Sequence, residues 1–174
     1  MYSISLNKPL PIDMIRRFYG NYFKPYEFTI DKVTIYTLLY EKNENFLRQI
    51  SFFVESDLDK IQKYVNDFLI FLKRNKINPD DVIWSYETYF EIDEKVKVKL
   101  NLPSNLPLIG SVTNLGIIVT NDPDLQMRNR NFTSVQVDRS GIKVIKRADK
   151  YIIIPQIIDE LEKLITILND SFKL

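Results

Sequence analysis

The side chains available for chemistry in this chain are carboxylates, lysines, arginines, tyrosines and serines, because its 174 residues include no histidine and no cysteine. Histidine is the usual general base near neutral pH and a common metal ligand, and the cysteine thiolate is a strong nucleophile. Their absence excludes Ser–His–Asp and Cys–His triads, zinc fingers, histidine-ligated haem and disulfides. What remains is carboxylate, amine or hydroxyl chemistry, or binding without catalysis.

A basic run near the end of the chain is the strongest local signal. It holds seven cations and two carboxylates, in a chain whose net charge is +1. Strand alternation places Lys143 and Arg147 on one face, which Phe132 of the neighbouring strand shares. Cations that neutralise phosphates beside a ring that stacks on a base are typical of single-stranded nucleic-acid platforms. The candidate nucleic-acid-binding residues are Arg128, Arg130, Phe132, Arg139, Lys143, Lys146, Arg147 and Lys150.

The alternative interpretation of this run is a solvated hairpin, whose charges keep an edge strand from aggregating. Neither an RNA-recognition signature nor a helix-turn-helix pattern accompanies it. The four glycines of the chain also form no phosphate-binding loop. The basic run could equally bind an acidic protein, so both alternatives stay open.

Aromatic residues crowd residues 18–26, too densely for every ring to be buried on one helix face. Exposed aromatic rings beside charged side chains are typical of protein interfaces. The segment therefore predicts a surface for a protein partner or a second copy of the chain, with core packing as the alternative. The candidate interface residues are Phe18, Tyr19, Tyr22, Phe23 and Tyr26.

Carboxylates gather in the middle of the chain, where Asp80, Glu91 and Asp93 form a candidate set for a metal-dependent nuclease. Two or three carboxylates can hold Mg²⁺ without histidine. Pro79-Asp80 followed by Asp93-Glu94-Lys95 is superficially similar to the PD-(D/E)xK nuclease pattern. That family places the second acid and the lysine within a strand, whereas here they fall in a predicted turn. No catalytic residue, metal ligand or cofactor is therefore assigned.

Three amphipathic helices are expected to position these groups. The first covers residues 11–22, with apolar residues at helical spacing. The second follows a capping-box pattern in Ser56-Asp57-Leu58-Asp59 and continues to about residue 75. The third begins at Pro155, a residue type favoured in the first turn of a helix.

Strand patterns occupy most of the remaining chain. A three-residue loop is expected to join the strands at residues 83–92 and 96–100, which sets Glu91 opposite Lys97. Because helices and strands do not alternate regularly, the sequence predicts a single α+β domain over residues 1–174. Its sheet is expected to be mostly antiparallel, with about seven to nine strands, two long amphipathic helices and one short N-terminal helix. The expected strands are residues 33–41, 46–55, 83–92, 96–100, 107–120, 132–137, 142–146 and 151–154. The first two are expected to form a hairpin, and turns are expected at residues 78–81 and 138–141.

Together, these patterns predict a non-catalytic binding module, an accessory or assembly subunit of a nucleic-acid-handling, ribonucleoprotein-like complex. The alternatives are a metal-dependent nuclease and a self-associating structural protein without a nucleic-acid role. The expected partners are a protein or a second copy, together with RNA or single-stranded DNA. The sequence shows no secretory signal and no apolar stretch long enough to span a bilayer, so we expect a cytoplasmic protein without membrane contact. Its bias toward residues with A/T-rich codons is typical of an AT-rich archaeon or virus, in which antiviral defence is one setting.

Overall fold

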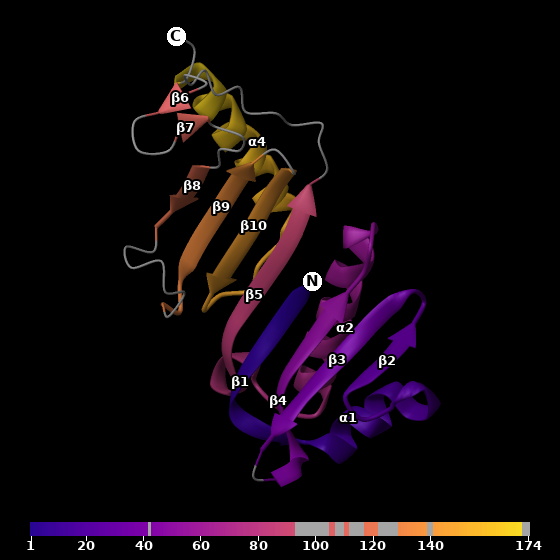
Figure 1. Cartoon of the computed structure of the whole chain (residues 1–174). Helices are drawn as coiled ribbons and strands as arrows, with labels where there is room; N and C mark the ends of the chain where they lie inside the picture. Colours follow the sequence, from indigo (N-terminus) through magenta and orange to yellow (C-terminus); the bar gives the residue numbers. More distant parts are fainter. Residues whose placement is uncertain are drawn as a thin grey trace. The chain divides into compact units, whose positions relative to one another are not determined.

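A computed structural model describes residues 1–41, 43–92, 105–106, 110–111, 117–121, 129–138 and 141–171. In this part of the chain the fold is α+β, with four α-helices and one large antiparallel sheet (Figure 1). The eight strands of the sheet follow the order β2-β3-β4-β1-β5-β10-β9-β8. They are β1 (Tyr2–Pro11), β2 (Glu27–Ile30), β3 (Val33–Tyr40), β4 (Asn43–Phe53), β5 (Ile83–Ile92), β8 (Ile117–Thr120), β9 (Phe132–Asp138) and β10 (Gly141–Ala148). The short strands β6 (Asn105–Leu106) and β7 (Gly110–Ser111) pair only with each other.

The chain divides into two compact units. The first contains Met1–Thr88 and Arg147–Ile152, and the second contains Tyr89–Lys146 and Ile153–Leu174. Strands β5 and β10 each contribute residues to both units. The expectation of a single domain stays a prediction.

The described part of the chain contains one helix more than expected. Besides α1 (Ile12–Tyr19), α2 (Leu58–Arg74) and α4 (Ile154–Ser171), the chain forms the four-residue helix α3 (Pro79–Val82) where the sequence indicated a plain turn. The Asn78 side chain caps α3 by accepting a hydrogen bond from the Asp80 backbone N–H at 3.4 Å. Proline at the first position of a helix and asparagine before it are favoured combinations, so the local signal was present.

The first helix ends three residues earlier than expected. Gly20 adopts a positive φ of 56°, which stops α1 at Tyr19, and a 3₁₀ turn, η1 (Gly20–Tyr22), follows. Helix α2 is capped by Asp57, whose side chain accepts from the Lys60 backbone N–H at 3.3 Å. The capping residue is therefore Asp57 rather than Ser56.

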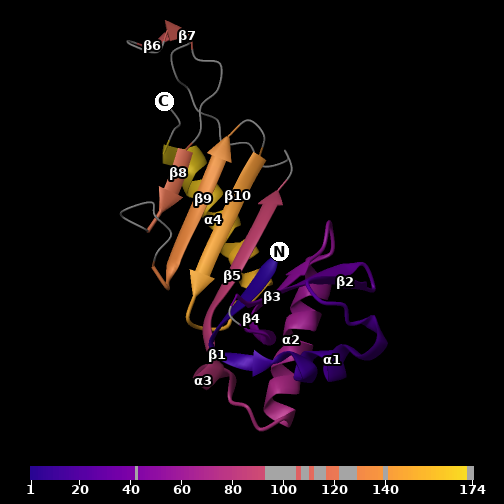
Figure 2. The ribbon, with the colours of Figure 1, turned by 60° about the horizontal axis from the view of Figure 1, so that its bottom comes forward.

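The core of the first unit lies between its sheet and α2. Helix α2 covers one face of β1, β3 and β4 (Figures 1 and 2). Phe68 of α2 packs near Phe52 of β4, with ring centroids 6.4 Å apart. The register pairs Tyr2 with Phe52 and Ser3 with Ser51, so large apolar and small polar residues alternate between the two faces.

The buried Tyr2 ties the segment after β10 to this core. Its hydroxyl donates to the Ile152 carbonyl at 3.1 Å and accepts from the Ile152 backbone N–H at 3.2 Å. Tyr151 also hydrogen-bonds Gln62 and Asn66 of α2. Burial raises the pKa of the neighbouring Tyr86 to about 12, because its charged form would be poorly solvated. Residues 147–152 thus belong to the first unit, and Ile152 lies in its core.

Five of the expected strands match the structure, those at residues 33–41, 46–55, 83–92, 132–137 and 142–146. The expected strand at residues 151–154 is wrong, because residues 151–153 form no regular element and Ile154 begins α4. Strands β1 and β2 were not expected. The predicted β3–β4 hairpin is confirmed, with Thr34 paired to Phe53, and β5 and β9 lie where the sequence placed them. Strand β1 was missed because polar residues and prolines interrupt its alternation at a register shift between Ser5 and Leu10. Strand β2 was missed because it has only four residues.

The second unit packs α4 against the sheet formed by β9 and β10 (Figure 2). Ile142 and Val144 alternate along β10 and are buried, as are Ile157, Leu161 and Ile165 along α4. The predicted strand at residues 96–100, the loop that precedes it, and the Arg139-Ser140 part of the predicted turn lie outside the described residues.

Candidate binding surfaces

The cations of β10 are held in ion pairs. The pairs are Lys143 Nζ to Glu91 Oε1 at 3.7 Å, Lys146 Nζ to Glu160 Oε2 at 3.2 Å, and Arg147 Nη2 to Glu87 Oε2 at 2.5 Å. Each cation is therefore balanced by a carboxylate before any ligand arrives. A phosphate would have to compete with that carboxylate for each of these side chains.

The Lys143 and Arg147 pairs follow from strand alternation, whereas the Lys146 pair joins β10 to α4. Glu87 and Glu91 are four residues apart on β5, and Arg147 and Lys143 are four residues apart on β10, so each pair meets across the strands. The side chains of Lys143 and Glu91 are 40% and 54% exposed, whereas those of Arg147 and Glu87 are 20% and 27% exposed. The Arg147 pair is the better shielded from solvent, and its Nε also donates to Glu87 Oε2 at 2.6 Å. The predicted partner of Glu91, Lys97, lies outside the described residues.

The other members of the basic run are dispersed. The Phe132 side chain is only 2% exposed, so the expectation that its ring would stack on a base is wrong in this structure. The ring belongs to the core because it begins β9 among buried apolar residues. Arg130 and Lys150 are exposed. Arg128 and Arg139 lie outside the described residues.

The aromatic segment divides into buried and exposed rings. Tyr19 is buried, and Phe18 and Phe23 are half-buried. Tyr22 and Tyr26 are 62% and 55% exposed. Burial raises the pKa of Tyr19, and nearby Tyr64 and Asp67 raise it further. Only Tyr22 and Tyr26 of the predicted interface residues present most of a ring to solvent.

The carboxylates of the middle segment do not converge. Asp80 and Asp81 occupy the first turn of α3, while Glu87 and Glu91 hold cations of β10. In the described part of the chain, no group of three or more acidic side chains is arranged to bind a metal ion. Asp93, the third member of the predicted nuclease set, lies outside the described residues.

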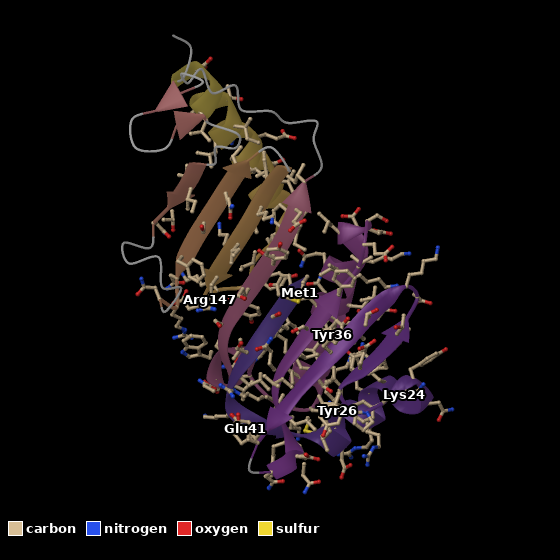
Figure 3. All side chains as sticks on the ribbon, in the orientation of Figure 1. Met1, Lys24, Tyr26, Tyr36, Glu41 and Arg147 are labelled. Atoms are coloured by element: carbon tan, nitrogen blue, oxygen red, sulfur yellow. The ribbon has the colours of Figure 1, made fainter. Side chains whose placement is uncertain are left out.

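One face of the first unit's sheet carries exposed apolar side chains. Tyr36 and Leu38 of β3 and Phe53 of β4 are all exposed, with Leu38 at 50%. Phe53 pairs with Thr34, so it is the diagonal neighbour of Tyr36 on the same face. Figure 3 shows Tyr36 in front of β3, on the side away from α2. We call Tyr36, Leu38 and Phe53 the open-face cluster.

The floor beside the open-face cluster is made of small polar side chains. Ser3 and Ser51 hydrogen-bond each other at 2.8 Å, and Gln49 donates to Ser51 at 3.0 Å. Ser3 and Ser51 are buried although α2 lies on the opposite face of these strands. Each hydroxyl has a hydrogen-bond partner within the sheet, so each would keep that bond when a partner protein covers this face.

Trp84 is 37% exposed, although strand alternation along β5 would place it on the same face as the buried Tyr86 and Phe90. The β1–β5 register shifts at this point, between Ser5 and Leu6 on β1. The guanidinium carbon of Arg147 lies 5.8 Å from the centroid of the Trp84 ring. No signal in the sequence indicated this cation–π pair, because 63 positions separate the two residues.

A second set of cations gathers where α1 and α2 end. The Phe18 ring of α1 stacks on the Phe71 ring of α2, with centroids 4.4 Å apart and an interplanar angle of 24°. The last turn of α1 contains Arg16 and Arg17, and the last turn of α2 contains Arg74. No sequence pattern indicated this set, because 57 positions separate Arg17 from Arg74.

Comparison of the chain with protein-family models, curated proteins and solved structures finds no match to any of them. None of the helices in the described residues is both long enough and apolar enough to cross a bilayer.

Proposed function

We propose that the chain is a cytoplasmic, non-catalytic binding module, an accessory subunit of a nucleic-acid-handling complex that holds a protein partner on the open-face cluster. The observation that carries the proposal is the exposure of Tyr36, Leu38 and Phe53 as neighbours on one sheet face. Single exposed apolar residues are ordinary, but neighbouring ones that include aromatic rings are typical of protein interfaces.

The surroundings of the cluster support a protein ligand. The hydroxyls of Ser3 and Ser51 bond each other, so each keeps a hydrogen bond when a partner's apolar surface covers them. Tyr26, which is exposed, lies next to β3, since its backbone N–H donates to the Thr37 hydroxyl at 3.0 Å. An exposed tyrosine at the margin provides a ring and a hydroxyl at low entropic cost.

The test is affinity capture of the tagged protein from its native host, with and without nuclease, followed by mass spectrometry. We expect stoichiometric protein partners that survive nuclease and that Leu38→Glu loses, because the new carboxylate would be desolvated in the interface. Ile70→Glu is the matched control, since Ile70 is an exposed apolar residue on α2, outside the open-face cluster. Circular dichroism of both variants verifies folding.

Two outcomes would contradict the proposal: capture of the same partners by Leu38→Glu, or recovery of no protein partner by the wild type. Light scattering of the purified chain measures its molar mass and so tests for self-association. A dimer that Leu38→Glu dissociates and Ile70→Glu preserves would make the partner a second copy of the chain.

A further inference from the structure

The ends of α1 and α2 form one surface of the first unit. Phe18 stacks on Phe71 and lies 6.5 Å from Phe68, measured between ring centroids. Arg17 adjoins Phe18 in sequence, and Arg74 follows Phe71 by three residues, which places it on the same side of α2. The two arginines therefore lie within one helical turn of the stacked rings, one on each helix.

Cations outnumber carboxylates at this surface. Residues 13–24 and 67–76 contain six cations and two carboxylates, Asp13 and Asp67. Asp13 pairs with Arg16 at 2.8 Å. All six cations are exposed, and we define the α1–α2 basic cluster as five of them: Arg16, Arg17, Lys24, Arg74 and Lys76.

Most of these cations have no carboxylate partner. Within the described part of the chain, Arg17, Arg74 and Lys76 form no ion pair with an acidic side chain. Arg17 donates from Nε to the backbone carbonyl of Asp13 at 3.3 Å, which fixes the side chain but leaves its charge uncompensated. Such side chains can take up a phosphate without first losing a salt bridge.

Helix dipoles explain part of this arrangement but not all of it. Basic residues in a last turn stabilise a helix C-terminus, which accounts for Arg16, Arg17 and Arg74. Lys24 follows η1 and lies beside α1 (Figure 3), and Lys76 follows the end of α2. These two lysines lie outside the helices and extend the charge beyond what the helix termini need.

Aromatic rings accompany the cations. Tyr22 is the most exposed large aromatic ring in the described residues and ends η1, the turn that follows α1. The guanidinium carbon of Arg16 lies 5.7 Å from the centroid of Phe23. Bases offer their faces to such rings only when they are unpaired, so the combination favours single-stranded over duplex nucleic acid.

We propose that the α1–α2 basic cluster, together with Tyr22, binds single-stranded nucleic acid, with the cations on the phosphates and Tyr22 against a base. This inference rests on the proposed role in a nucleic-acid-handling complex and assigns that role a site. It also places the nucleic-acid contact at the ends of α1 and α2 instead of on β10, where each cation is already paired with a carboxylate.

The test is fluorescence anisotropy of labelled 15-nucleotide oligo-dT and oligo-U with the purified chain, over a salt series. We expect both to bind, a duplex of equal length to bind several-fold more weakly, and Arg17→Ala/Arg74→Ala to lose about tenfold in affinity with a shallower salt dependence. Tyr22→Ala should weaken binding about fivefold without changing the salt slope. Comparing the two oligonucleotides distinguishes DNA from RNA.

Lys143→Ala/Lys146→Ala is the matched control, because it removes the same number of positive charges from paired positions. We expect it to change affinity less than twofold. An equal or larger loss in this control, or no binding by the wild type at low salt, would overturn the inference. Binding to phosphatidylserine vesicles without oligonucleotide binding would assign the cluster to lipid instead. None of these outcomes affects partner capture through Leu38, so failure of this inference is distinguishable from failure of the proposed function.

Discussion

The cations of β10 and those at the ends of α1 and α2 have the same charge but different surroundings. On β10, Lys143, Lys146 and Arg147 each lie within ion-pair distance of a glutamate. At the α1–α2 basic cluster, Asp13 pairs with Arg16 alone. The density of charge along a sequence is therefore a poor guide to the charge a surface can offer to a ligand.

The difference arises from what each element places opposite its cations. A strand inside a sheet has neighbours on both sides, and side chains four residues apart on two neighbouring strands can form matched pairs. The last turn of a surface helix has no neighbouring strand, and its negative end itself attracts cations. Cations on strand interiors are thus readily neutralised, while those at helix ends remain available.

The largest expected effect comes from separating α1 from α2. Phe71→Ala removes the ring on which Phe18 stacks, and we expect the free energy of unfolding to fall by about 3 kcal/mol. Oligonucleotide affinity should fall as well, although every cation is still present. Urea denaturation measures the first effect and anisotropy the second. Ile70→Ala, at the exposed neighbouring position, should change neither, and wild-type stability in Phe71→Ala would show that the stacked rings do not join the helices.

A smaller effect is expected from breaking the shielded pair of β10. Glu87→Gln leaves the Arg147 charge only partly solvated, and we expect a loss of about 2 kcal/mol. The emission of Trp84, the only tryptophan of the chain, should shift because Arg147 lies against its ring. Glu91→Gln in the more exposed pair should cost about 0.5 kcal/mol or less. Equal losses in the two variants would contradict the difference in shielding.

The smallest effect concerns the other end of α2. Asp57→Ala removes the side chain that accepts from the Lys60 backbone N–H, and we expect the free energy of unfolding to fall by about 1 kcal/mol. Ser56→Ala is the control and should be nearly neutral. A larger loss in Ser56→Ala, measured by urea denaturation, would restore the capping box that the sequence predicted.

The parts of the fold that the sequence predicted are those with a long local period. The α+β class, the β3–β4 hairpin and helix α2 follow from apolar spacing over eight or more residues. Strand β1 could not be predicted, because prolines and Lys8 interrupt its alternation, although its residues Tyr2 and Ile4 are buried. Tertiary pairing with β4 and β5 overrides the weak local preference there.

The candidate sites were less predictable than the fold. The sequence correctly marked residues 18–26 as too aromatic to be entirely buried, and Tyr22 and Tyr26 are exposed. It could not show that Phe132 is buried, since strand alternation alone does not say which face is covered. Nor could it bring α1 and α2 together at their C-terminal ends, because that depends on the contact between Phe18 and Phe71.

The hydrogen bonds between Tyr2 and Ile152 have a consequence for how the chain folds. They join residues 150 positions apart, and β1 takes its place in the sheet between β4 and β5. Folding slows as contacting residues become more distant in sequence, because the intervening loop must be closed before the contact forms. We therefore expect the β3–β4 hairpin to form early and the core around Tyr2 to close late. On the ribosome, that core must wait until Ile152 has emerged.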